Sequence, residues 1–311
     1  MIYNVRHRTT YVYDAPVAFT RCVLRLTPQT SPNQALIHLA IALSPEPSRT
    51  EERIGPFDEP TLALIIEENH SQLTIEASSI VDVHAPRVED PCDSPPWEAV
   101  RAASFATQDL GPASPATYLY PTARTQLAPA ITEYARESFA AGRPIIEAAT
   151  ELMGRIRAQF TYDPEASNSS TTPGQAFAAR HGVCQDFANI MICGLRGLGL
   201  PAAYVCGYLR TVPPPGRPRL EGADATHAWV RLWCGEERGW IGFDPTNAIY
   251  AENDHITLTV GRDTADTAPI EGLLLATGDQ SLKVEVDVIP AEGVSLFAGG
   301  EPLPREPRPR F

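Results

Sequence analysis

The sequence predicts an α+β protein, in which an all-β N-terminal domain precedes a domain of mixed helices and strands. Apolar residues alternate with polar or small residues in several runs within the first 90 positions, as in half-buried strands. Apolar residues recur at helical spacing over 145–156 and again over 184–197. Three further strand-like runs follow the second helix, at 203–211, 225–232 and 239–243.

The N-terminal β domain is expected to span residues 1–90. Ile37, Leu39, Ile41 and Leu43 alternate with polar or small residues, which is the period of a strand with one buried face. Other strand-like runs are bounded by Pro, Asn, Ser and Gly and lie at 3–13, 23–26, 61–67 and 73–83. This spacing predicts a small sandwich-like domain, and we interpret it as a scaffold because nothing in it resembles a site.

The second domain is expected to span residues 123–298, after a linker at 91–122 that is rich in Pro, Ser and Ala. The polar segment 161–174 and the Pro-rich segment 213–222 are expected to be surface loops. The alternating run 282–288 predicts a late strand that closes this domain. Residues 299–311 carry several Pro and Arg and are expected to form a disordered tail.

The composition excludes some classes of partner. A formal charge of −13 argues against a nucleic-acid partner, because phosphate binding relies on clustered Lys and Arg. No run approaches the roughly 18 consecutive apolar residues of a membrane span, and the charged, Tyr-rich N-terminus does not resemble a signal peptide. We therefore expect a cytoplasmic protein without a membrane partner, and the oligomeric state stays open. The six cysteines are then expected to be thiols.

Cys184 stands where the second helix is expected to begin. Unpaired backbone N–H groups and the helix dipole favour an anion at that position, which would help a thiolate. Gly182 permits a close backbone approach just before the helix. Taken alone, the residue fits a buried structural thiol better than a reactive one.

His227 and Asp244 become informative when they are taken together with Cys184. Each is weak evidence alone, because a strand histidine is usually a packing residue and Asp before Pro is usually a turn residue. If the strands 225–232 and 239–243 form a hairpin, the two side chains lie side by side. The carboxylate could then hold the imidazole in one tautomer while its other nitrogen faces the thiol.

Four ordered segments together resemble the bacterial transglutaminase-like family. They read GVCQDFA at 182–188, LGLPAAYVCGYL at 198–209, THAW at 226–229 and GWIGFDPTN at 239–247. Residues 3–28 are similar to the N-terminal β region that accompanies this core in bacteria, and 261–266 with the late strand resemble its closing segment. The resemblance implies a papain-like core without a cofactor, in which a helix bearing Cys184 packs on an antiparallel sheet bearing His227 and Asp244.

The resemblance also implies catalytic roles. Cys184 would be the nucleophile, His227 the general base and then acid, and Asp244 the residue that orients the histidine. Cys184 N–H and a second donor would bind the oxyanion, and Tyr162 is the candidate for that donor, with a packed aromatic as the alternative. Gln185 is a candidate substrate contact. Trp229 is a candidate wall of the acyl site, although core packing is the favoured explanation for it.

A metal site is the competing interpretation of a Cys, His and Asp set. Zinc sites usually show paired ligands at short spacing, and His181 with Cys184 is the only such pair. His227 and Asp244 are better used as a triad, so we predict no metal.

The predicted function is an acyl-thioester reaction on the peptide or side-chain amide bonds of a peptide or protein substrate. Hydrolysis is favoured, because crosslinking of cytoplasmic proteins would be hazardous. Transamidation of protein glutamine is the alternative. A binding or assembly module with an idle site is a third possibility, which the intact triad disfavours.

Overall fold

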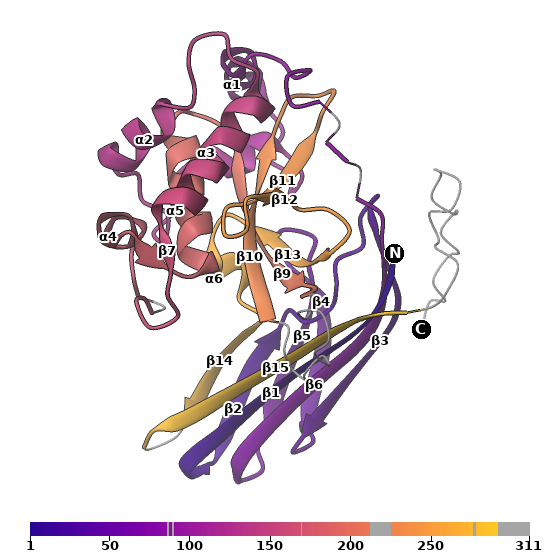
Figure 1. The fold of residues 1–311 in the computed structure, drawn as a ribbon. Helices are drawn as coiled ribbons and strands as arrows, with labels where there is room; N and C mark the ends of the chain where they lie inside the picture. Colours follow the sequence, from indigo (N-terminus) through magenta and orange to yellow (C-terminus); the bar gives the residue numbers. More distant parts are fainter. Residues whose placement is uncertain (86, 89, 169, 212–224, 276–277, 292–311) are drawn as a thin grey trace, which may run out of the picture.

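The computed structural model describes residues 1–311 except 86, 89, 169, 212–224, 276–277 and 292–311. Two β-sheets lie at one end of the molecule, and a third sheet with helices around it lies at the other (Figure 1). The predicted α+β class is confirmed. The expected loop at 213–222 and the tail at 299–311 lie outside the described residues.

The N-terminal domain consists of two antiparallel four-stranded sheets. Their strand orders are β15-β1-β6-β3 and β14-β2-β5-β4. Residues of both sheets, such as Tyr13, Leu24, Ile66 and Ile75, form the core between them. The strands are β1 (Ile2–Val17), β2 (Phe19–Leu24), β3 (Gln34–Ser44), β4 (Arg49–Ile54), β5 (Pro60–Ile66), β6 (His70–Val83), β14 (Ile270–Leu275) and β15 (Gln280–Pro290).

The last two strands belong to this domain and not to the second one, so the assignment of the late strand to the catalytic domain is wrong. β15 pairs with β1 from Tyr3↔Pro290 to Tyr13↔Gln280, and β14 pairs with β2. The alternation over 282–288 is correct as a strand signal, but periodicity does not indicate which edge a strand joins. The N-terminal domain is therefore built from both ends of the described chain.

The second domain is a five-stranded antiparallel sheet of order β12-β11-β10-β9-β13, with helices packed on it (Figure 1). A short parallel pair, β7 with β8, leads into its central buried helix. The strands are β7 (Thr161–Tyr162), β8 (His181–Gly182), β9 (Ala202–Leu209), β10 (Ala225–Trp233), β11 (Trp240–Asp244), β12 (Ile249–Tyr250) and β13 (His255–Gly261). The helices are α1 (Trp97–Ala106), η1 (Pro115–Tyr118), α2 (Pro129–Arg136), α3 (Ile145–Gln159), α4 (Pro173–Ala179), α5 (Cys184–Gly197) and α6 (Thr264–Thr267).

Helix α5 lies at the centre of this domain. The predicted start at Cys184 and the end at Gly197 are confirmed. The sequence indicates only one apolar face, yet every residue from Asp186 to Arg196 is buried. Gly194 allows this on the side of α2, because a Cβ there would lie 2.8 Å from the Cβ of Ala135. A helix covered on all sides holds its N-terminus, and with it Cys184, in a fixed place.

Residues 91–122 are not a simple linker. They contain α1 and η1, and Trp97 and Val100 of α1 are part of the main core. The indole N–H of Trp97 donates to the carbonyl of Ala140 at 3.0 Å. The helix is missed in the sequence because Pro and Ser dominate the residues that flank it.

The two domains share a packed junction. Tyr3 and Val81 of the first domain form one cluster with Tyr208, Ile256 and other residues of the second. The side chain of Gln34 also bridges the domains, since its amide accepts from the N–H of Thr257 and donates to the carbonyl of Thr257, both at 2.7 Å. Gln34 contacts Thr257 at the position where the register between β13 and β9 shifts. The two hydrogen bonds therefore hold β13, the strand that begins with His255, against the first domain.

Among the described residues, the helices are too short or too polar to cross a bilayer.

Candidate active site

Cys184 is the first residue of α5, and the turn before it is tightly held. The Oδ2 atom of Asp186 accepts hydrogen bonds from the N–H of Val183 at 2.8 Å and from the hydroxyl of Ser167 at 2.5 Å. A Cβ on Gly182 would lie 2.7 Å from that same oxygen, so only glycine fits there. Asp186 therefore caps the helix, and the thiol stands at the positive end of the dipole.

His227 and Asp244 meet across the hairpin of β10 and β11. The two strands pair antiparallel from Val230↔Phe243 to Trp233↔Trp240, which brings the start of β10 beside the end of β11. The Nε2 atom of His227 lies 2.8 Å from the Oδ2 atom of Asp244. The predicted juxtaposition of these two side chains is present in the structure.

The carboxylate of Asp244 is completely buried and accepts from several donors. Its Oδ1 atom accepts from the N–H groups of Thr246 and Asn247, at 3.0 and 3.2 Å. Its Oδ2 atom accepts from the side-chain amide of Asn247 at 2.7 Å as well as from His227. Burial alone would raise the pKa of Asp244, but hydrogen bonds from His227, His255 and Asn247 hold it below its ordinary value. The carboxylate is therefore an ionised acceptor at neutral pH.

The imidazole of His227 is 8% exposed and lies between Asp244 and Cys184. Burial lowers its pKa, but hydrogen bonds with Asp244 and with the Cys184 sulfur outweigh burial and raise the pKa to about 9. Because Nε2 faces Asp244, the nitrogen left for the sulfur is Nδ1. The structure thus brings the three residues together: His227 is hydrogen-bonded to Asp244 and lines the same cleft as Cys184.

A second histidine, His255, completes the cluster and was not identified from the sequence. Its Nε2 atom lies 3.2 Å from Oδ2 of Asp244, and its ring packs edge-on against Trp229 at 5.1 Å. His255 is the first residue of β13, which is separated from β10 by β9. It is only 5% exposed. The sequence shows only that a histidine precedes an apolar strand. It does not show that this strand lies one strand away from β10, which carries His227.

His227, Asp244 and His255 also form a geometric candidate for a metal, because their ligand atoms all lie within 4.8 Å of one another. A metal needs a lone pair on each imidazole nitrogen that binds it. Here both Nε2 atoms face an ionised carboxylate and must each carry a proton to donate to it. The donor set therefore fits a hydrogen-bonded cluster better than a metal site.

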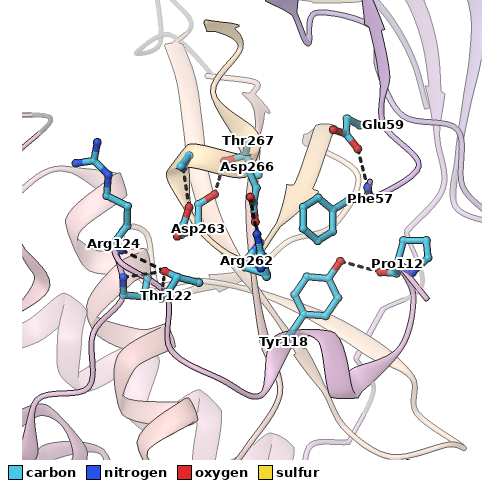
Figure 2. Close-up of polar contacts among 12 residues, drawn as sticks. Phe57, Glu59, Pro112, Tyr118, Thr122, Arg124, Arg262, Asp263, Asp266 and Thr267 are labelled. Atoms are coloured by element: carbon cyan, nitrogen blue, oxygen red, sulfur yellow. Dashed lines mark hydrogen bonds and ion pairs between the residues drawn. The ribbon is translucent and has the colours of Figure 1, made fainter. Parts of the chain in front are cut away.

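A cleft of about 500 Å³ opens beside Cys184. Cys184, Gln185 and His227 line it, together with Ala228, Ala265 and Ala268, so part of the wall consists of small side chains. The segment around α6 also lines the cleft, and Figure 2 shows the polar contacts that hold this segment in place. There Asp263 accepts from the N–H of Ala265 at 2.7 Å, and the hydroxyl of Thr267 donates to the carbonyl of Asp263 at 3.0 Å.

Arg196 connects this wall to α5 from inside the core. Its guanidinium is almost fully buried and donates to the carbonyl of Arg262 at 2.7 Å, to the Thr125 hydroxyl at 2.7 Å and to the carbonyl of Tyr118 at 3.0 Å. Burial lowers the pKa of Arg196 to about 10, so the group stays charged at neutral pH. The helix that carries Cys184 thus also holds the backbone just before Asp263 and α6. Arg196 is not apparent as a site residue from the sequence.

The other three predicted site residues differ in their position relative to the cleft. Gln185 lines the cleft. Tyr162 lies on β7, paired with Gly182, and its ring packs on Phe187 at 6.4 Å, but it is not among the cleft-lining residues. Burial and, secondarily, the charge of Cys184 raise the pKa of Tyr162. Trp229 is buried against His227 and His255 and lines a different cavity, which agrees with the packing explanation.

Two family descriptions match this chain. Residues 3–82 match the bacterial transglutaminase-like N-terminal region, and residues 132–245 match the transglutaminase-like superfamily. The second match contains Cys184, His227 and Asp244.

Similar proteins extend over almost the whole length. An uncharacterised protein of Mycobacterium tuberculosis is 38% identical, and the match covers 95% of each chain. An uncharacterised protein of Mycobacterium leprae is 28% identical over 92% of this chain and 97% of that one. A protein-glutamine gamma-glutamyltransferase of Pseudomonas aeruginosa is 29% identical over 124 residues, which are 40% of this chain and 18% of that protein.

The fold is also similar to a solved structure. A candidate cysteine protease from Cytophaga hutchinsonii superposes with a TM-score of 0.71 at 20% identity, covering 95% of this chain and 93% of the other. At this identity the similarity establishes the shared fold, with both domains included.

Proposed function

The chain belongs to the transglutaminase-like superfamily, and on this premise we propose that it is a cysteine enzyme that cleaves amide bonds of peptide or protein substrates. The supporting observation is the chain of contacts from Cys184 through His227 to Asp244, with 2.8 Å between the imidazole and the carboxylate. A nucleophile, a base beside it and a group that orients the base are the parts that acyl transfer requires.

The first half-reaction forms a thioester. With a pKa of about 9, His227 is largely protonated at neutral pH, which suits an imidazolium beside a Cys184 thiolate. The sulfur attacks the carbonyl carbon and forms the C–S bond, and the electron pair of the C=O bond moves to the oxygen. When the oxyanion collapses, the C–N bond breaks and the Nδ1 proton of His227 passes to the leaving amine.

The oxyanion needs donors in place before the reaction. The first N–H groups of a helix have no intrahelical acceptor, and Cys184 and Gln185 occupy these positions in α5. Their N–H groups are the donors that we assign. The Tyr162 hydroxyl is the proposed additional donor, since Tyr162 pairs directly with Gly182, two residues before Cys184. One such donor typically contributes about 3–4 kcal/mol to transition-state stabilisation.

The second half-reaction consumes the thioester, and we propose water as the acceptor. His227, now neutral, takes a proton from water, the hydroxide oxygen bonds to the acyl carbon and the C–S bond breaks. Cys184 is partly exposed, and several small side chains, such as those of Ala228 and Ala265, line the cleft beside it, which leaves room for water at the thioester. A transamidase would need an amine to compete with water at this position.

The test is a digest of a peptide library and of glutamine-containing peptides in ¹⁸O-water, with and without a primary amine, followed by mass spectrometry. Hydrolysis adds one ¹⁸O to the acid product, whereas transamidation gives an amine adduct. Cys184→Ala is the negative control, and Cys92→Ala is the matched cysteine variant, because Cys92 is an exposed thiol outside the cleft. Amine adducts without ¹⁸O incorporation would replace hydrolysis by transamidation.

An idle binding module is separated from an enzyme by alkylation with iodoacetamide at neutral pH. Desolvation and the nearby carboxylates of Glu147 and Asp90 raise the pKa of Cys92, so this exposed thiol should react slowly. Faster labelling at Cys184 than at Cys92, reduced by His227→Ala, is expected of the enzyme. Equal rates at the two thiols would contradict the proposal.

A further inference from the structure

A second cavity of about 650 Å³ lies on the far side of the triad, where the two domains meet. Its floor is the outer side of the catalytic sheet, with Trp229, Arg231 and His255. Its walls include Gln34 and Val83 of the first domain and several side chains of the second, which are Trp240, Ile241 and Tyr250. As lined by the described residues, this junction cavity and the catalytic cleft share no residue.

Arg231 is the feature of the junction cavity that packing does not explain. Its guanidinium has one hydrogen bond with another described residue, from Nη2 to the hydroxyl of Thr257 at 3.2 Å, although the group carries five N–H donors. Within the described part of the chain it forms no ion pair. The residue is partly buried, and this burial lowers its pKa. A partly desolvated cation without a carboxylate partner is costly unless something else supplies the negative charge.

The other charged groups of the cavity are accounted for. Arg87 pairs with Glu252 at 3.9 Å, and Arg238 pairs with Asp93 at 2.7 Å. Glu237 is exposed and solvated. Among the three arginines of the described lining, Arg231 is therefore the one without a carboxylate within ion-pair distance.

We propose that the junction cavity binds a small monocarboxylate with an aromatic or aliphatic body. The carboxylate would take the free N–H groups of Arg231, and the apolar body would lie against Trp229, Trp240 and Tyr250. A monoanion matches the single charge of the Arg231 guanidinium, whereas a phosphate dianion would bring excess negative charge next to Glu237 and Glu252. The cavity also reaches His255, so its occupant lies one residue away from the carboxylate of Asp244.

The test measures binding on the Cys184→Ala variant, so that its result does not depend on the proposed function. The probes are 3-phenylpropionate, its neutral analogue 3-phenylpropanamide, and phenyl phosphate, titrated by calorimetry and by tryptophan fluorescence. We expect one saturable site at which the carboxylate binds about tenfold or more tighter than the amide, since a charge-assisted pair in a partly dry site contributes at least that factor. Phenyl phosphate is expected to bind more weakly than the carboxylate.

Arg231→Met should abolish the preference for the acid over the amide, and Arg231→Lys should reduce it, because lysine keeps the charge but loses the fork geometry. Arg238→Met is the matched control, since this arginine lines the same cavity but is already paired with Asp93. Its acid preference should equal that of the parent protein. Equal affinity for acid and amide in the parent, or an unchanged preference in both Arg231 variants, would overturn the proposal and leave Arg231 as a structural link between the domains.

Discussion

The Nε2 atom of His255 lies 3.2 Å from the Oδ2 atom of Asp244, the same oxygen that accepts from Nε2 of His227 at 2.8 Å. One carboxylate oxygen is therefore shared by two imidazoles that come from strands on either side of β9. Gly207 of β9 is the residue paired with His227 in the sheet. Because Gly207 has no side chain, the ring of Trp229 can lie directly against this strand. The orientation of the proposed general base thus depends on packing across three strands.

Replacing His255 by Phe should lower kcat about tenfold to a hundredfold with little change in KM. A hydrogen bond to a charged group is worth about 1.5–3 kcal/mol, and its loss would let Asp244 and with it His227 shift. His255→Gln, which keeps a donor, should recover part of the activity. Steady-state kinetics on a peptide substrate gives the readout. Equal losses in both variants would indicate a purely steric role for this residue.

Cys184→Ala should abolish turnover and leave the fold intact. The thiol is partly exposed and lines the cleft, so its removal creates no closed cavity in the core. The measurement is product formation by mass spectrometry, with the thermal midpoint as the fold control. Residual turnover at the parental rate would show that another group is the nucleophile.

Asp244→Asn should reduce kcat by about 10³–10⁴ through the wrong histidine tautomer, by analogy with other triads. An asparagine amide at Oδ2 would present N–H groups to the donors of His227, His255 and Asn247, so stability should fall as well. Kinetics and urea unfolding on the same preparation separate the two effects. Full activity in a folded variant would show that the histidine is oriented by other means.

The stability of the protein should decrease with rising pH in the alkaline range. The pKa of His227 is raised in the folded state to about 9 from its ordinary value of 6.5. Protonation of His227 therefore favours the folded state, and this contribution is fully present below about pH 6.5 and is lost as the pH rises through about 9. Relative to His227→Gln, the free energy of unfolding of the parent should fall by about 3 kcal/mol over this window. Urea titrations across the range test this, and a difference that stays constant with pH would contradict the raised pKa.

Gly207→Ala should destabilise the fold by about 3 kcal/mol or more. An added Cβ would lie 2.1 Å from the carbonyl oxygen of Ile256 and 2.6 Å from the ring of Trp229, and neither can move freely in the sheet. Gly154→Ala is the matched control, because a Cβ added at this position of α3 would have no other atom within 4 Å. The comparison of their unfolding midpoints is the measurement, and equal midpoints would show that the sheet yields at Gly207.

Periodicity, turn residues and motif order in the sequence were enough to predict the helix and strands that depend on residues close together in the chain. The start of α5 at Cys184, the hairpin that joins His227 to Asp244, and most strands of the first domain follow from periodicity, turn residues and motif order. Long-range pairing was not accessible in the same way. The partner of β15 lies at the other end of the chain, as the pair Tyr3↔Pro290 shows, and nothing within β15 specifies that neighbour.

The residues missed at the site share a physical cause. His255 and Arg196 act through neighbours that are distant in sequence, and Arg196 is a buried cation in a helix that is covered on all sides. A polar residue in a buried element is the available signal, but the sequence does not say which carbonyl or carboxylate it will meet. Helix α1 was missed because of its local composition, since the Pro-rich residues around it resemble a linker.

The shared β domain has a consequence for how this protein is made. Strands β14 and β15 leave the ribosome last among the described elements, yet they pair with β2 and β1, which are synthesised long before them. Until they arrive, β1 and β2 each present an unpaired edge, which is the surface on which other strands add. A chain truncated before residue 270 should therefore retain the residues of the five-stranded sheet and yet aggregate, because its first domain would lack its closing strands.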